Sequence, residues 1–395
     1  MKKRFQYFMP TRILFGPGRL GDLAKTPFLP GKKALIVISA GKAMKANGYL
    51  QRLADALEKN GVSSAVFDRV LPNPVSEHVE EGAARAREEG CDFVIGLGGG
   101  SSIDSAKSIA VMARNPGEYW DYIVGGSGKG KKPSGGALPI VAIPTTAGTG
   151  TESDPWTVIT RTETREKIGW GADCTFPTLS IVDPELMLSV PPAFTAYQGM
   201  DAFFHAVEGY LARASQPASD HFALDAIEKI TRFLPVAVRD GSDLEARTAL
   251  AWASTEAGFV ESLSACISHH SLEHAMSACH PEIPHGAGLI MTSIAYFSYL
   301  AERDPARYGA MARAMGVDTG GADDDAGPAA FMAALEKLIR DIGMDGLKPE
   351  RFGLKKEEAE EIARNSMETM GSLYTLTPVR LTQEDVEAIF RNCFR

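Results

Sequence analysis

Strand-like and helix-like segments alternate along the first half of this chain, and the alternation stops near residue 190. Short apolar runs rich in β-branched residues stand at 32–39, 63–68, 92–97 and 138–144. Helical patterns separate most of them, as in residues 43–61, 76–90 and 102–114. Alternation of this kind predicts a parallel sheet with helices on both faces.

Beyond residue 190 the apolar residues recur at intervals of three and four, which is typical of helices. The pair Pro191–Pro192 interrupts the pattern and marks a boundary. We therefore expect an α/β domain over residues 1–190 and an all-helical domain over residues 191–395. The length of 395 residues and the hydrophobic content of 44% are enough for two cores.

The composition excludes several classes of partner. A formal net charge of -9 argues against nucleic acid or an anionic membrane surface as the main partner. No run is long and apolar enough to suggest a membrane span, and the start has no apolar core of signal-peptide length. Five scattered cysteines without a CxxC pair indicate reduced thiols and a cytoplasmic protein.

Two polar loops each follow a buried strand of the predicted sheet. Glycines after residues 92–97 let a backbone approach a pyrophosphate, and the helix expected from Ser101 or Ser102 offers free N–H donors. The alternative is a tight turn without a ligand, but a threonine-rich loop after residues 138–144 favours a dinucleotide at the carboxyl ends of the strands. The glycine loop holds Gly98, Gly99, Gly100 and Ser101, and the threonine loop holds Thr145, Thr146 and Thr149. The usual GxGxxG fingerprint is absent after the first strand.

A third glycine-rich stretch, GGSGKGK at 125–131, has the spacing of a phosphate-binding P-loop. Lys132 occupies the position of the Ser or Thr, and KKPSGG beyond it cannot start a helix. We expect a mobile surface loop there.

One carboxylate and three imidazoles form a candidate shell for iron or zinc. Asp201 and His205 are spaced i, i+4 in a helical pattern, so both project from one face, and His270 and His274 repeat that spacing. His285 starts the next helical pattern. Isolated histidines are usually surface or core residues, but five of the eight histidines fall between 269 and 285, which favours a metal site.

These features together resemble the iron-dependent (group III) alcohol dehydrogenases, which include lactaldehyde, 1,3-propanediol and butanol dehydrogenases. The motifs are FGPG, LPNP, GGGSSIDSAK, PTTAGTGTE, DPELM, GMDAFFHAVEGY and the HxxxH…PHG block, and they span essentially the whole chain. The resemblance implies an NAD- or NADP-linked dehydrogenase that transfers a hydride reversibly between the nicotinamide and a small alcohol or aldehyde. Fe(II), or Zn(II) in its place, would act as the Lewis acid, in a homodimer or larger homo-oligomer.

The resemblance also implies roles for individual residues. His274 matches a histidine near the nicotinamide and substrate, a candidate proton relay. The metal ligands would be Asp201, His205, His270 and His285. The cofactor would contact Gly98, Gly99, Gly100, Ser101, Thr145, Thr146 and Thr149, with Asn73 and Lys167. We expect Asp154 and Trp156 to line part of the substrate pocket.

Two departures from the family pattern leave questions open. The stretch between the HxxxH pair and PHG is one residue longer than usual, which puts the role of His280 in doubt. Ser39 or Ala40 stands where an aspartate would select NAD, so NAD and NADP both remain possible. A dehydroquinate-synthase-like lyase is the main alternative, although its ligand set resembles Glu-His-His. A non-catalytic nucleotide-binding protein is a further alternative.

Overall fold

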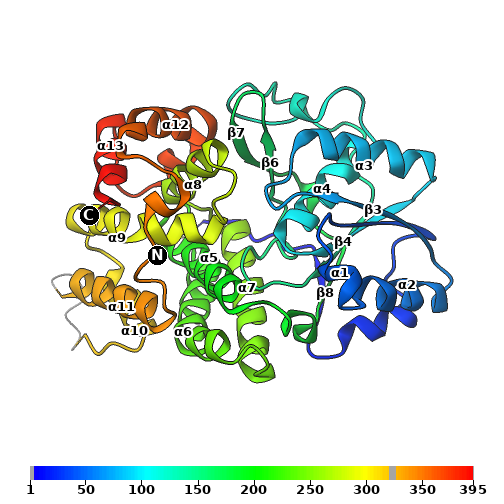
Figure 1. The fold of residues 1–395 in the computed structure, drawn as a ribbon, viewed down its shortest axis with the longest axis horizontal. Helices are drawn as coiled ribbons and strands as arrows, with labels where there is room; N and C mark the ends of the chain where they lie inside the picture. Colours follow the sequence, from blue (N-terminus) through cyan, green and yellow to red (C-terminus); the bar gives the residue numbers. More distant parts are fainter. Residues whose placement is uncertain (1–3, 320–325, 395) are drawn as a thin grey trace. The chain divides into compact units, whose positions relative to one another are not determined.

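The computed structural model describes residues 4–319 and 326–394, and the chain divides into two compact units (Figure 1). The first unit comprises Met9–Ser189, and the second comprises residues from Val190 onward together with the described residues before Met9. The N-terminal segment thus groups with the helical unit, where Gln216 Nε2 donates a hydrogen bond to the carbonyl of Gln6 at 2.9 Å. The strand and helix pattern of residues 1–190 gave no sign of this grouping.

The first unit is built on a six-stranded sheet in the order β1-β8-β5-β4-β2-β3, with every neighbouring pair parallel. Its strands are β1 (Arg12–Phe15), β2 (Lys33–Ser39), β3 (Ser63–Val70), β4 (Phe93–Gly98), β5 (Ile140–Pro144) and β8 (Leu179–Val182). The central strands β4 and β5 are buried along their whole length, as expected for a parallel sheet covered on both faces.

Helices cover both faces of this sheet: α1 (Ala43–Ala46), α2 (Tyr49–Lys59), α3 (Ser76–Glu88) and α4 (Gly100–Met112). Ile36 of β2 and Leu53 of α2 belong to one hydrophobic cluster. On the other face a Cβ at Gly96 of β4 would lie 2.7 Å from the Cα of Ile103, so α4 packs tightly there. The predicted helix over 43–61 is interrupted at Gly48, whose φ of 72° lies in the left-handed region.

A two-stranded antiparallel hairpin, β6 (Thr157–Arg161) and β7 (Glu166–Trp170), was not predicted. The segment 124–139 contains turns and irregular stretches but no helix, and the absence of a helix was predicted for the P-loop-like sequence. It is held in place by Ser127, whose N–H donates to Glu166 Oε1 at 2.6 Å and whose hydroxyl donates to Glu166 Oε2. The described residues of the two units also include short 3-10 helices: η1 (Arg19–Ala24), η2 (Tyr119–Asp121), η3 (Asp173–Thr175), η4 (Pro184–Met187), η5 (Pro349–Phe352) and η6 (Lys356–Glu358).

The second unit is helical throughout its described residues. Its helices are α5 (Pro192–Leu211), α6 (Pro217–Arg239), α7 (Leu244–Leu263), α8 (Ser268–Cys279), α9 (His285–Arg303), α10 (Tyr308–Ala314), α11 (Gly327–Asp341), α12 (Ala359–Leu376) and α13 (Gln383–Asn392). Almost every residue of α5 after Phe194 is buried, which makes it the central helix. The predicted fold class, an α/β unit followed by a helical unit, is therefore confirmed. Among the described helices, none has the length and apolar content that a bilayer crossing requires.

Candidate metal and cofactor sites

Three helices bring the four predicted metal ligands together in the helical unit. Asp201 and His205 lie on α5, His270 lies on α8, and His285 is the first residue of α9. The Nε2 atoms of the three imidazoles converge on Asp201 Oδ1, at 3.4 Å from His205, 3.6 Å from His270 and 3.4 Å from His285. Ligand atoms bound tetrahedrally to zinc at about 2.1 Å lie about 3.4 Å from one another. The spacing of this cluster fits a small divalent cation.

Unsatisfied buried atoms point to the same conclusion. Among the described residues, neither Asp201 Oδ1 nor His270 Nε2 has a hydrogen-bond partner, and both atoms are inaccessible to solvent. Buried polar atoms without partners are costly, and a cation satisfies both at once. A carboxylate with three imidazoles suits Fe(II) or Zn(II). The residues present therefore fit the metal that the sequence predicts.

The charges of the cluster are strongly coupled. Burial alone would raise the pKa of Asp201, but the facing imidazoles of His285 and His205 hold that pKa well below its usual range. Burial would lower the pKa of His270, and the adjacent carboxylate of Glu208 outweighs it and raises the pKa to about 9. A cation at Asp201 would compete with these imidazolium protons, so metal affinity should fall in acid.

Each ligand imidazole has a further partner on its Nδ1 atom, and these partners were not predicted from the sequence. Glu208 Oε1 lies 2.6 Å from His270 Nδ1, and Glu273 Oε2 contacts His285 Nδ1. His205 Nδ1 lies 3.2 Å from the thiol of Cys266 and 3.4 Å from Glu261 Oε2. Such partners fix the tautomer and orientation of a metal-binding imidazole. No local spacing in the sequence marks these partners, because Glu208 and His270 are 62 residues apart and Glu273 and His285 are 12 apart.

His274, the predicted proton relay, lies one turn after His270 on α8. Its ring centroid is 5.3 Å from that of His285, and its Nδ1 lies 2.8 Å from Met370 Sδ at a kink in α12. His280, whose role the longer spacing left open, is bonded through Nε2 to Glu358 Oε1 at 2.9 Å.

In the α/β unit the glycine and threonine loops lie against each other at the carboxyl ends of β4 and β5. A Cβ on Gly99 would lie 3.2 Å from Thr146 Oγ1, and a Cβ on Gly100 would lie 2.7 Å from Thr149 Cγ2. Helix α4 begins at Gly100, so its free N–H groups face this edge of the sheet. The two loops are close enough to contact one dinucleotide.

The other predicted cofactor residues of this unit lie on segments that hydrogen bonds connect to one another. The N–H of Thr145 donates to the carbonyl of Gly98 at 2.9 Å, and the Ser101 hydroxyl donates to the carbonyl of Pro72, next to Asn73. Lys167, on β7, pairs with Thr160, whose N–H donates to the carbonyl of Pro74 at 2.8 Å. The LPNP segment thus links the glycine loop to the hairpin. The contacts of Asn73 and Lys167 with a cofactor stay predictions.

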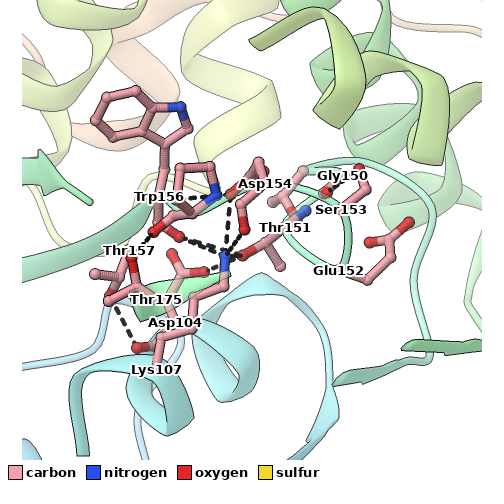
Figure 2. Close-up of polar contacts among 12 residues, drawn as sticks. Asp104, Lys107, Gly150, Thr151, Glu152, Ser153, Asp154, Trp156, Thr157 and Thr175 are labelled. Carbon is pink, nitrogen blue, oxygen red and sulfur yellow. Dashed lines mark hydrogen bonds and ion pairs between the residues drawn. The ribbon is translucent and has the colours of Figure 1, made fainter. Parts of the chain in front are cut away.

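A buried lysine ties helix α4 to the end of the threonine loop (Figure 2). Lys107 Nζ donates to Thr151 Oγ1 at 2.7 Å, to Asp154 Oδ1 at 3.0 Å and to the carbonyl oxygens of Asp154 and Trp156 at 2.9 and 2.6 Å. The Thr151 hydroxyl in turn donates to Asp104 Oδ1 at 2.7 Å. Asp154, which we expected to line the substrate pocket, is instead bound to Lys107 with 2% of its side chain exposed.

Comparison with known proteins identifies the family. Residues 10–184 match the family described as iron-containing alcohol dehydrogenase, and residues 195–394 match its C-terminal counterpart. The chain is 32% identical over 389 residues to the NAD-dependent methanol dehydrogenase of Bacillus methanolicus, covering 98% of this chain and 99% of that protein. It is 33% identical over 400 residues to the 1,3-propanediol dehydrogenase of Klebsiella pneumoniae, covering 99% of each.

A solved structure agrees with these matches over the full length. The alcohol dehydrogenase of an archaeal halo-thermophilic organism from a Red Sea brine pool superposes with a TM-score of 0.95 at 33% identity, and the match covers 100% of both chains. The resemblance inferred from the motifs is confirmed, and the dehydroquinate-synthase-like alternative is not favoured. This chain belongs to the family of iron-containing alcohol dehydrogenases.

Proposed function

We propose that the protein oxidises a small alcohol, and reduces the corresponding aldehyde, with a nicotinamide cofactor and a divalent metal. The observation that carries the proposal is the convergence of three imidazole Nε2 atoms on a buried Asp201 Oδ1 that has no hydrogen-bond partner among the described residues. Fe(II) is the proposed metal because the family is iron-containing, and Zn(II) is its substitute.

The metal site would be formed by Asp201, His205, His270 and His285. A divalent cation there supplies Lewis acidity, which favours an alkoxide over an alcohol and polarises a carbonyl in the reverse direction. Glu208 orients His270 by accepting its Nδ1–H, so that Nε2 is presented toward Asp201. Three of these ligands, Asp201, His205 and His270, are buried, which strengthens the electrostatic interactions among them.

The glycine and threonine loops would bind the cofactor. The first N–H groups of α4 and the side-chain-free backbone at Gly99 and Gly100 suit a pyrophosphate, as the helix dipole favours an anion there. The methanol dehydrogenase of Bacillus methanolicus is named as NAD-dependent, which supports NAD. Ser39 ends β2 without a charge that would repel a 2′-phosphate, so NADP belongs in the assay.

His274 would move the proton. Its ring centroid lies 5.3 Å from that of His285, which places the imidazole beside the proposed metal site where a substrate hydroxyl would bind. We expect His274→Ala to retain the metal while kcat falls about 100-fold and its pH profile loses the imidazole limb. His280→Ala is the matched control, since that imidazole is held by Glu358. Loss of the metal in His274→Ala, or an unchanged pH profile, would contradict the relay.

The deciding experiment is a turnover assay that follows absorbance of the reduced cofactor. Chelator-treated protein is reloaded with Fe(II) or Zn(II) under anaerobic conditions and given short alcohols, diols and neutral or acidic aldehydes with NAD and NADP. We expect activity only with both metal and cofactor present. Metal-free protein that turns over alcohols at the full rate would refute the metal mechanism, and binding of cofactor without turnover of any substrate would favour a non-catalytic protein.

We also propose that the chain forms a homodimer or a larger homo-oligomer in the cytoplasm. Exposed aromatic side chains near the N-terminus support an interface, with Phe5 54% and Tyr7 57% exposed. The five cysteines, all within the described residues, are free, which suits a reducing compartment. Light scattering of the purified protein tests the assembly, and a monomer at micromolar concentration would refute it.

A further inference from the structure

His285 differs from the other three candidate ligands in how it is placed. Its side chain is 23% exposed, whereas those of Asp201, His205 and His270 are 5%, 7% and 4% exposed. It is also the first residue of α9 and follows the turn of residues 280–284, whereas the others stand inside long buried helices. A terminal, partly exposed imidazole needs an anchor to keep its Nε2 directed at Asp201.

Glu273 of α8 is in position to be that anchor. Its side chain is completely buried, and its Oε2 contacts His285 Nδ1, on the side of the ring opposite the atom that faces Asp201. Glu273 stands three residues after His270, so the helix that carries one ligand also carries the partner of another. Neither motif matching nor the ligand spacing assigned a role to this residue.

The start of α9 is shaped to admit this carboxylate. A Cβ on Gly288, one turn after His285, would lie 2.7 Å from Glu273 Cγ and 2.8 Å from its Oε1. A Cβ on Gly286 would collide with the carbonyl of Tyr197 on α5. The first turn of α9 therefore packs against α5 on one side and against the buried Glu273 on the other.

We propose that Glu273 is a positioning residue for the metal site, acting through His285. Its carboxylate accepts the Nδ1–H of His285, which fixes the tautomer with Nε2 unprotonated, locks the ring orientation and increases the donor strength of Nε2. The charge buried at Glu273 is in turn compensated by the cation on the far side of the ring. This inference rests on the proposed function, because it assumes a cation among Asp201, His205, His270 and His285.

The test measures affinity for the metal alone. Glu273→Gln and Glu273→Leu chains are stripped of metal and titrated with Zn(II) against a competing chelator, and Co(II) is added separately to record its visible absorption. We expect the dissociation constant for Zn(II) to rise about 10- to 100-fold in Glu273→Leu, and less in Glu273→Gln, which can still accept a hydrogen bond. The Co(II) bands should shift as the geometry loosens.

Glu282→Gln is the matched control. Glu282 also pairs with a histidine, at 3.5 Å from His280 Nδ1, but its side chain is 58% exposed and His280 is outside the four candidate ligands. The Glu282→Gln variant should bind Zn(II) with the affinity of the wild type. Gly288→Ala should also weaken Zn(II) binding, because the added methyl displaces Glu273 without removing its charge. This variant replaces Glu273→Leu in the test if Glu273→Leu fails to fold.

A variant cycle separates a positioning role from a general structural one. In a His285→Ala background, Glu273→Gln should change Zn(II) affinity by less than about twofold, because the residue through which Glu273 acts is gone. An equal loss in both backgrounds, or wild-type affinity in the single variants, would overturn the inference. Wild-type protein that binds no stoichiometric Zn(II) would instead overturn the proposed metal function itself.

Discussion

Each of the two units contains a cluster of buried charged side chains, and the clusters differ in how completely their atoms are paired. In the α/β unit, Lys107 Nζ has four acceptors within 3.0 Å (Figure 2). Asp104 accepts from the Thr151 hydroxyl and from the N–H of Val158. In the helical unit, Asp201 Oδ1 and His270 Nε2 are equally buried and make no hydrogen bond to any described residue.

This difference in pairing indicates a structural role for the Lys107 cluster and a ligand-binding role for the Asp201 cluster. A buried charge is tolerated when its partners lie in the same chain, and a network with all its members satisfied holds its elements rigidly. The Lys107 network joins α4 to the end of the threonine loop, so it holds these two elements together. The incomplete pairing at Asp201 fits a site that a bound cation would complete.

The sharpest way to break this comparison is to remove one ligand. In His270→Ala we expect bound metal to be lost and kcat to fall by at least about 1000-fold, because the Lewis acid contributes several kcal/mol to transition-state stabilisation. Metal per chain by atomic spectroscopy and kcat are measured on the same samples. His221→Ala, on the exposed surface of α6, is the control and should change neither value. Full turnover of a metal-free His270→Ala protein would end the metal assignment.

The second test removes the central charge of the satisfied network. Lys107→Met leaves the buried carboxylate of Asp154 without its cation, so we expect the unfolding free energy of the α/β unit to fall by about 3–5 kcal/mol. Lys129→Met is the control, since that lysine pairs with Asp121 from a side chain that is 62% exposed, and its loss should cost less than about 1 kcal/mol.

Urea unfolding measures the free energy of unfolding of both variants. Metal content of folded Lys107→Met should equal that of the wild type, while the dissociation constant for the cofactor rises because the threonine loop loses its anchor. Wild-type stability in Lys107→Met would mean that pairing within the network contributes nothing, and the contrast between the clusters would then lose its meaning.

The sequence predicted the ligands of the incomplete cluster but not the partners within either cluster, and the reason is distance along the chain. Asp201 with His205 is visible as an i, i+4 pair, and the spacing of His270 and His274 repeats it. The partners come together only in the fold: Lys107 and Thr151 are 44 residues apart, and Glu208 and His270 are 62 apart. No local pattern marks such pairs.

The same reasoning applies to the fold. The parallel sheet was predictable because buried apolar runs alternate with helical patterns in the first unit. The hairpin β6–β7 was not, because its strands are five residues each and its turn lacks an Asn-Gly or Asp-Gly pair. In this turn Arg165 adopts a left-handed φ of 53°, and no sequence pattern predicts that conformation. Local sequence patterns thus predicted the parallel sheet, whereas the β6–β7 hairpin depends on features that no local pattern marks.

A third buried cluster, around Glu256, is intermediate between the two in how completely its charges are paired. Its removal gives the smallest predicted effect on stability. Glu256 on α7 is 2% exposed, and Lys229 Nζ lies 3.6 Å from its Oε2 while also pairing with Asp225. Burial, and then the hydrogen bond with Asp225, raises the pKa of Glu256 from 4.5 to about 8. The folded chain therefore holds this proton more tightly than the unfolded chain does.

The sign of the pH dependence follows from that shift. The contribution of Glu256 to stability is complete below pH 4.5 and is lost as the pH rises to about 8, where the folded carboxyl ionises. We expect Glu256→Gln to match the wild type at pH 4.5 and to exceed it by about 1–2 kcal/mol at pH 9 in urea unfolding. Glu336→Gln, whose side chain is 51% exposed, should show no such divergence. Equal stabilities of Glu256→Gln and wild type at pH 9 would mean that Lys229 compensates the charge fully, and Glu256 would then belong with the satisfied Lys107 network rather than between the two.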